Sequence, residues 1–139
     1  MFFIFFNFYI YPINPFKSMI MKNILVIEDD KLISSLVSFR LKKEGFNITL
    51  ANDCEEGMNM FDSTNPDLVI TDVLIPIHDG IDFVEFTKNK RPNCPVIVLS
   101  SMGDEEATVI KAFESGASDF VPKPFNPSEL AFRVKRLIA

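Results

Sequence analysis

The sequence predicts an α/β domain built on a parallel β-sheet that helices cover on both faces. Three observations support this prediction. A chain of 139 residues has the length of one domain, and from position 23 onward short apolar runs alternate with segments of helical period. The apolar runs are also rich in branched side chains, which is typical of strands buried on both faces. Strands that alternate with helices in this way pair in parallel.

The predicted elements follow one another without interruption from residue 23 to the end of the chain. Strands are predicted at five apolar runs, Asn23–Ile27, Phe46–Ala51, Leu68–Thr71, Pro95–Leu99 and Ser118–Val121. Helices are predicted after each of them, at Leu32 to Leu41, Asp53 to Phe61, Gly80 to Asn89, Asp104 to Ser115, and Pro127 to the end. This is the element order of five successive strand–helix units.

Capping residues mark the ends of several predicted helices. Asp53 and Asn126 each precede a helix and are followed three residues later by a glutamate, the pattern of a capping box. Pro127 then occupies the first position of the last helix, where a proline is favourable. Gly45 and Gly116 follow the first and fourth helices and are predicted to end them.

Composition and charge exclude several classes of function. The net charge is −5 and the pI is near 4.8, so a broad basic surface for nucleic acid is not expected. Cys54, Cys94 and the single histidine, His78, have no companions at metal-ligand spacing, which excludes a zinc site. The two thiols are interpreted as reduced and buried, as in a cytoplasmic protein.

Residues 1–20 differ in composition from the rest of the chain. They hold eight aromatic residues and one charged residue, Lys17. Prolines and asparagines interrupt the apolar run, so neither a membrane span nor a signal peptide is predicted. We interpret 1–20 as an apolar extension that is not native or is disordered, with translation starting at Met19 or Met21. The alternative is an interfacial membrane anchor, which lacks supporting basic residues.

Chemically reactive side chains follow four of the predicted strands. Glu28, Asp29 and Asp30 come after the first strand, Asp72 after the third, Ser100 and Ser101 after the fourth, and Lys123 after the fifth. In an open parallel sheet, ligands bind beyond the carboxyl ends of the strands. If the first and third strands are neighbours, their ends lie about 4.8 Å apart, which brings three acids together.

Such a group of acids suits a hard cation. Two carboxylates about 4 Å apart repel by about 4 kcal/mol at an effective dielectric constant of 20. Oxygen ligands with several waters favour Mg²⁺ over softer metals. Adding the Lys123 ammonium and the Ser100 hydroxyl gives a set that fits the oxygens of a phosphoryl group. Taken singly, each residue has a structural explanation, and for Asp30 we favour that of a helix cap.

Four separated motifs resemble the receiver domain of two-component response regulators. They are I-L-V-I-E-D-D (24–30), D-V-L-I-P-I-H-D-G (72–80), V-I-V-L-S-S (96–101) and D-F-V-P-K-P-F-N-P-S-E-L (119–130). The resemblance covers 21–139, and R-V-K-R-L (133–137) is most similar to receivers of the winged-helix DNA-binding class. It implies a flavodoxin-like (βα)5 fold, a doubly wound parallel sheet with strand order 2-1-3-4-5.

The resemblance also implies a role for each reactive residue. Asp72 would be the phosphate acceptor, and Asp29, Asp72 and the backbone carbonyl of Leu74 would bind Mg²⁺. Glu28 would assist through a water molecule. Ser100 and Lys123 would hold phosphoryl oxygens, and the Lys123–Pro124 peptide bond would be cis. The other expected positions are the switch residues Ser100 and Phe120 and the interface residues Lys111, Asp119, Glu129, Arg133 and Arg136.

As a receiver, the chain would not be an enzyme in its own right. Its expected partner is a sensor histidine kinase or phosphotransfer protein, with a weak phosphorylation-dependent homodimer. The domain itself would contact no nucleic acid, would not span a membrane and would be cytoplasmic. Transcription regulation would follow if a DNA-binding domain came after it.

An alternative to the receiver function is a haloacid-dehalogenase-type phosphatase, an enzyme that also forms an aspartyl phosphate. That family places its nucleophile after the first strand and a second aspartate two residues later, whereas Leu74 stands two residues after Asp72. An FMN-binding flavodoxin is disfavoured because acids after the first strand would repel phosphate. A degenerate receiver would lack a key residue, and none is missing.

Overall fold

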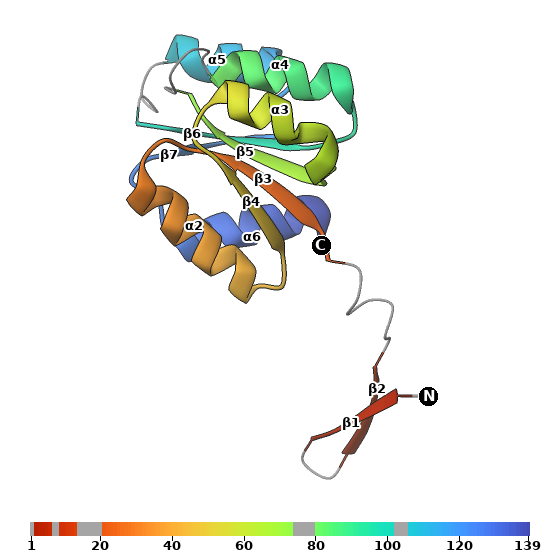
Figure 1. Cartoon of the computed structure of the whole chain (residues 1–139). Coiled ribbons are helices and arrows are strands. Elements are labelled where there is room, and N and C mark those ends of the chain that lie inside the picture. Colours follow the sequence, from red (N-terminus) through yellow and green to blue (C-terminus); the bar gives the residue numbers. More distant parts are fainter. Residues whose placement is uncertain (1, 7–8, 14–20, 74–79, 102–105) are drawn as a thin grey trace.

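The computed structural model describes residues 2–6, 9–13, 21–73, 80–101 and 106–139 (Figure 1). Its main sheet consists of β3 (Asn23–Ile27), β4 (Asn47–Ala51), β5 (Leu68–Asp72), β6 (Val96–Ser100) and β7 (Asp119–Pro122). All pairs of neighbouring strands are parallel, and the order across the sheet is β4-β3-β5-β6-β7. In chain order this is 2-1-3-4-5, so the predicted fold class is confirmed.

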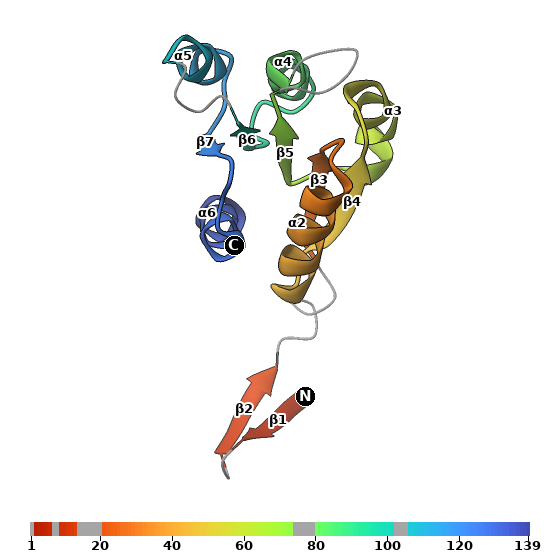
Figure 2. The same ribbon diagram turned by 90° about the vertical axis from the view of Figure 1, so that its left-hand side faces the viewer.

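Helices cover both faces of this sheet. They are α2 (Lys31–Lys43), α3 (Cys54–Thr64), α4 (Gly80–Lys90), α5 (Glu106–Glu114) and α6 (Pro127–Ile138). Figures 1 and 2 show α2 and α6 on one face and α3, α4 and α5 on the other. Each strand therefore lies between two layers of helix, which explains the continuous apolar runs in the sequence.

Alternating strand residues fill two separate cores. Successive side chains of a strand point to opposite faces. On β3, Ile24 and Val26 pack with residues of α2 and α6, whereas Leu25 and Ile27 pack with residues of α3, α4 and α5. Among the largest of these core side chains is Phe61, which contacts the ring of Phe86 edge-on at 5.3 Å between centroids. Both cysteines are buried thiols.

Three of the predicted N-terminal helix caps are present. Asp30 accepts hydrogen bonds from the N–H groups of Leu32 and Ile33, so it is the N-cap of α2. Asn126 caps α6 in the same way. Asp53 accepts from the N–H of Glu56 at 2.8 Å, but the Glu56 carboxylate accepts from the side-chain amide of Asn52.

The ends of several elements differ from the sequence prediction. Helix α3 continues to Thr64 instead of Phe61 and ends at Asn65, which adopts a left-handed conformation with φ of 49°. Asparagine tolerates this conformation and can end a helix like a glycine. Strands β6 and β7 each begin one residue later than predicted. The predicted cap Asp104 lies outside the described residues.

Two further strands precede the main sheet. β1 (Phe2–Phe6) and β2 (Tyr9–Ile13) pair antiparallel in a sheet of their own and do not join the five-stranded sheet. No strand was predicted in this segment. Among the described residues, none of the helices combines the length and apolar character needed to cross a membrane.

Candidate functional site

The acidic residues lie where two adjacent strands end. β3 and β5 are neighbours, with Ile27 opposite Thr71. Glu28 and Asp29 directly follow β3, and Asp72 is the last residue of β5. The sheet thus brings together acids that are more than 40 positions apart in the sequence, as predicted.

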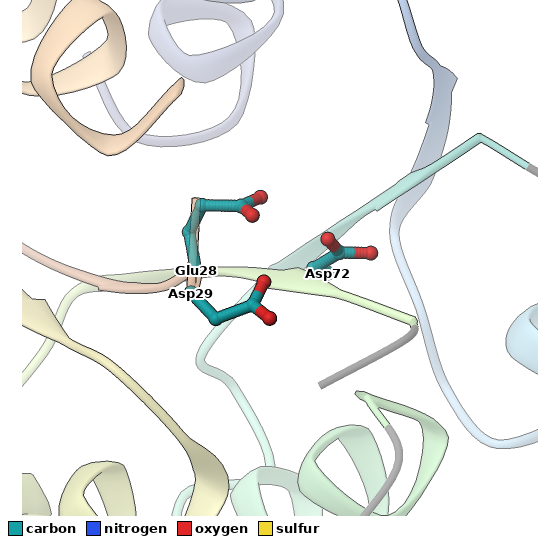
Figure 3. Close-up of side chains that lie close together, drawn as sticks. All are labelled: Glu28, Asp29 and Asp72. Carbon is teal, nitrogen blue, oxygen red and sulfur yellow. The ribbon is translucent and has the colours of Figure 1, made fainter. Parts of the chain in front are cut away.

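Figure 3 shows the three carboxyl groups gathered at this edge of the sheet. One carboxylate oxygen from each of Glu28, Asp29 and Asp72 lies within 4.8 Å of the others. Glu28 and Asp72 are 2% and 6% exposed, whereas Asp29 faces solvent. Two of the three acids therefore lie in a region of reduced dielectric constant, where their mutual repulsion is stronger than in water.

Lys123 provides the positive charge at this cluster. Its Nζ lies 2.8 Å from Oε2 of Glu28 and 2.6 Å from Oδ2 of Asp72. Burial alone would lower the pKa of Lys123, but the hydrogen bonds to the two carboxylates outweigh burial and raise it. Burial raises the pKa of Glu28, although its hydrogen bonds with Lys123 and with the N–H of Asp30 oppose the shift.

Ser100 lies at the same edge of the sheet, on the strand between the one that carries Asp72 and the one that precedes Lys123. It is the last residue of β6, which pairs with β5 on one side and β7 on the other. Its backbone carbonyl accepts a hydrogen bond from the N–H of Lys123 at 2.8 Å, and the residue is buried. The backbone thereby joins the end of β6 to the segment that holds Lys123.

The resulting site combines a carboxylate cluster with an ammonium and a hydroxyl. Three acids with one lysine leave a surplus of negative charge, which a divalent cation would neutralise. The donor set is oxygen only, which fits Mg²⁺ better than a thiophilic metal. A divalent cation there would bring the formal charge of the three acids, the lysine and the ion to zero.

The predicted interface residues gather on α6 and β7, and most of them pair with one another. Asp119 is 8% exposed and lies 2.7 Å from Arg133 and 3.5 Å from Arg136. Arg133 also pairs with Glu129 at 2.9 Å. Lys111 on α5 is exposed. Asp119, Glu129, Arg133 and Arg136 are thus already paired within the chain.

Of the remaining predicted features, the structure describes Phe120 and the Lys123–Pro124 peptide bond but not Leu74. Phe120 is half-buried on β7 and packs against the core under α3, α4 and α5. The Lys123–Pro124 peptide bond is cis, as the resemblance implied. Leu74, predicted to supply a backbone carbonyl to the cation, lies outside the described residues.

Two further residues donate hydrogen bonds to the backbone of Asp72 and Val73, and the sequence assigned neither of them a role in the site. The Thr71 hydroxyl donates to the Asp72 carbonyl oxygen at 3.1 Å. Gly80 is buried, and its N–H donates to the carbonyl of Val73 at 2.8 Å. The sequence signals for Gly80 were the predicted start of a helix and its place at the end of the D-V-L-I-P-I-H-D-G motif.

Comparisons with known proteins agree with this geometry. The family model for the response regulator receiver domain matches residues 24–135. The alkaline phosphatase synthesis transcriptional regulatory protein PhoP of Bacillus subtilis is 33% identical over 117 residues, which are 84% of this chain and 48% of PhoP. The chain spans about half the length of the curated relatives it matches.

Solved structures give the same result. The BeF3-activated DrrB receiver domain superposes with a TM-score of 0.79 at 37% identity, covering 85% of this chain and 97% of that one. The beryllofluoride-activated NtrC4 receiver domain dimer superposes with a TM-score of 0.80 at 30% identity, again over 85% and 97%. The haloacid-dehalogenase alternative is not favoured by any of these similarities.

Proposed function

The chain belongs to the response regulator receiver domain family, and from this premise we propose that Asp72 is the residue that accepts the phosphoryl group. A sensor histidine kinase or phosphotransfer protein would be the donor. An Asp72 carboxylate oxygen forms a bond to phosphorus while the bond to the donor's histidine nitrogen breaks, and that nitrogen keeps the electron pair and takes a proton. The strongest support is the position of Asp72, buried and 2.6 Å from Lys123.

A Mg²⁺ ion would be held by Asp29, Asp72 and the backbone carbonyl of Leu74, with Glu28 acting through a water molecule. The clustering of the three carboxylates within 4.8 Å supports this assignment. When bound, the cation neutralises the carboxylates and the phosphoryl oxygens as they approach. The acids of this chain set its position.

Lys123 and Ser100 would hold the phosphoryl oxygens. The Lys123 ammonium is fixed by two carboxylates, so it needs little reorganisation to contact a phosphoryl group on Asp72. Ser100 ends the strand beside β5 and would donate its hydroxyl to another oxygen. Both side chains act as donors to the negative charge that develops during transfer.

Phosphorylation would change the face formed by α5, β7 and α6. A phosphoryl group adds a charge of about −1.5 to −2, which draws the Ser100 hydroxyl toward Asp72. Phe120, half-buried on the adjacent strand β7, would then turn inward. Because Asp119 is next to Phe120 in the chain, this motion would alter the ion pairs of Asp119 with Arg133 and Arg136.

The altered face would support a weak homodimer. The NtrC4 receiver, which is similar in fold, forms a dimer when activated with beryllofluoride. We expect beryllofluoride to produce a dimer here as well, and Arg133→Glu to weaken it. Sedimentation of both proteins tests this proposal. A monomer at high micromolar concentration would instead favour a different partner on the same face.

We further propose that 21–139 is the receiver domain and that 1–20 lies outside it, in a cytoplasmic signalling protein that is not an enzyme. The family match begins at residue 24 and the relatives are response regulators. Deleting 1–20 should leave phosphorylation unchanged. A deletion that abolished phosphorylation in a folded protein would assign these residues to the domain.

The central experiment is to incubate the protein with phosphoramidate and Mg²⁺ and to measure the mass of the intact protein by mass spectrometry. The wild type should gain one phosphoryl group, and the Asp72→Asn variant should gain none. Asp62→Asn, which changes an exposed acid on α3, is the matched control and should be phosphorylated like the wild type. Labelling of the Asp72→Asn variant, or no labelling of the wild type, would contradict the proposal.

A further inference from the structure

The amino end of α4 packs directly against the backbone of Asp72. Figure 2 shows α4 beside the carboxyl end of β5. A Cβ atom added to Gly80 would lie 2.0 Å from the carbonyl oxygen of Asp72 and 2.7 Å from its carbonyl carbon. It would also lie 2.9 Å from the Cα of Val73. Ordinary contacts between carbon atoms are about 3.5–4.0 Å, so only a hydrogen atom fits here.

All three neighbouring atoms belong to the backbone, which cannot swing aside as a flexible side chain can. The contact is further fixed by the hydrogen bond from the Gly80 N–H to the Val73 carbonyl. Ile81 and Phe83, which follow Gly80 in α4, are buried in the core. A side chain at position 80 must therefore displace the end of β5, the start of α4, or both.

The end of β5 is the part of the sheet that sets the position of the Asp72 carboxylate. That carboxylate is held 2.6 Å from Lys123 and within 4.8 Å of the two acids of β3. A displacement of about 1 Å would break the hydrogen bond to Lys123, and errors of this size cost roughly 100-fold in rate at reactive centres.

We propose that Gly80 is a positioning residue for the phosphate acceptor: the absence of a side chain lets α4 pack on the Asp72 peptide and so fixes the carboxylate against Lys123 and the acidic cluster. Gly80 acts through Asp72 and touches no reacting atom. The inference rests on the proposed function of Asp72, but the packing contact itself does not.

The test is the Gly80→Ala variant, with Gly116→Ala as the matched control. Gly116 has a φ of 110°, so alanine is strained there as well, but its nearest neighbour is the flexible side chain of Lys88. Gly116 follows α5 and precedes β7, which places it at the opposite edge of the sheet from Asp72. Both variants should lose stability, and only Gly80→Ala should change the site.

The first readout is the pKa of Lys123, measured by NMR of its side chain in the absence of Mg²⁺ and of a phosphodonor. Asp72 raises this pKa in the wild type. The pKa should fall in Gly80→Ala, in the same direction as in Asp72→Asn, and should stay at the wild-type value in Gly116→Ala. This measurement needs no phosphorylation, so it remains informative if Asp72 proves not to be the acceptor.

The second readout is the phosphorylation rate at saturating Mg²⁺, corrected for the folded fraction. We expect Gly80→Ala to be about 100-fold slower than the wild type and Gly116→Ala to match the wild type. A folded Gly80→Ala protein with an unchanged Lys123 pKa and an unchanged rate would overturn the inference. If Gly80→Ala remains unfolded even in trimethylamine N-oxide, which favours compact states, Gly80 is required for the fold and the positioning role is likewise overturned.

Discussion

The two edges of the five-stranded sheet use charged residues in opposite ways. At the amino edge, where the strands begin, three charged groups bond to the backbone: Asp67 accepts from the N–H of Asn23, Arg91 donates to the carbonyl of Pro66, and Lys88 donates to the carbonyl of Cys94. At the carboxyl edge, the acids Glu28 and Asp72 share the single ammonium of Lys123. The difference separates charges that hold the fold together from charges that create a reactive site.

The energetic balance of the two edges differs for the same reason. A charged group that satisfies a backbone donor or acceptor contributes about 1.5–3 kcal/mol to stability. At the carboxyl edge, burial and, to a lesser extent, the charge of Asp72 raise the pKa of Glu28, so keeping this carboxylate ionised in the folded protein costs stability. The carboxyl edge therefore gives up stability at the site where we propose that a cation and a phosphoryl group bind.

The largest expected effect is the loss of transfer when the carboxyl edge loses its lysine. Lys123→Ala removes the ammonium that contacts Asp72, and we expect phosphorylation by phosphoramidate to slow by about 100- to 1,000-fold. Lys88→Ala is the matched control at the amino edge and should leave the rate unchanged. Equal rates in the two variants would remove the distinction between the edges.

A large effect on stability is expected at the amino edge. Arg91→Ala leaves the carbonyl of Pro66 without this donor and also removes the hydrogen bond to the side chain of Asn65. We expect the free energy of unfolding in urea to fall by about 1–3 kcal/mol. The phosphorylation rate of the folded protein should not change, and a slower rate would show that this edge also influences the site.

The pH dependence of stability should reveal the strain at the carboxyl edge. Because burial raises the pKa of Glu28 above its usual 4.5, the folded state holds this proton more tightly than the unfolded state. Its contribution to stability is present below pH 4.5 and is lost as the pH rises through the raised pKa. Without Mg²⁺, Glu28→Gln should therefore become more stable relative to the wild type as the pH rises over that range. A pH-independent difference between the two proteins would contradict this.

The smallest effect is expected for an exposed ion pair. Lys90 and Asp62 form a pair at 3.1 Å, with side chains that are 42% and 80% exposed. Exposed pairs contribute about 0–1 kcal/mol. Lys90→Ala should therefore lower the free energy of unfolding less than Arg91→Ala does. A larger loss for Lys90→Ala would mean that burial does not explain the difference between these cations.

Local sequence patterns were sufficient to predict the helices and strands of the main sheet and most of the helix caps. The five apolar runs became five parallel strands because each is long enough for a buried strand and is followed by a helix that returns the chain to the same edge. The acids at the ends of β3 and β5 could be predicted to meet, since parallel neighbours end together. Helix ends were less predictable: α3 continues to Thr64 and is ended by Asn65, which tolerates a left-handed conformation.

The contacts that define the site depend on the tertiary structure. Lys123 reaches Glu28 across 95 positions of sequence and Asp72 across 51, and Arg133 and Arg136 converge on Asp119. Side-chain rotamers and helix placement decide such contacts, and neither has a local pattern. Gly80 is the clearest case: its sequence position marks the start of a helix, but only the packing of α4 against β5 shows that a single methyl group there would meet the backbone of Asp72.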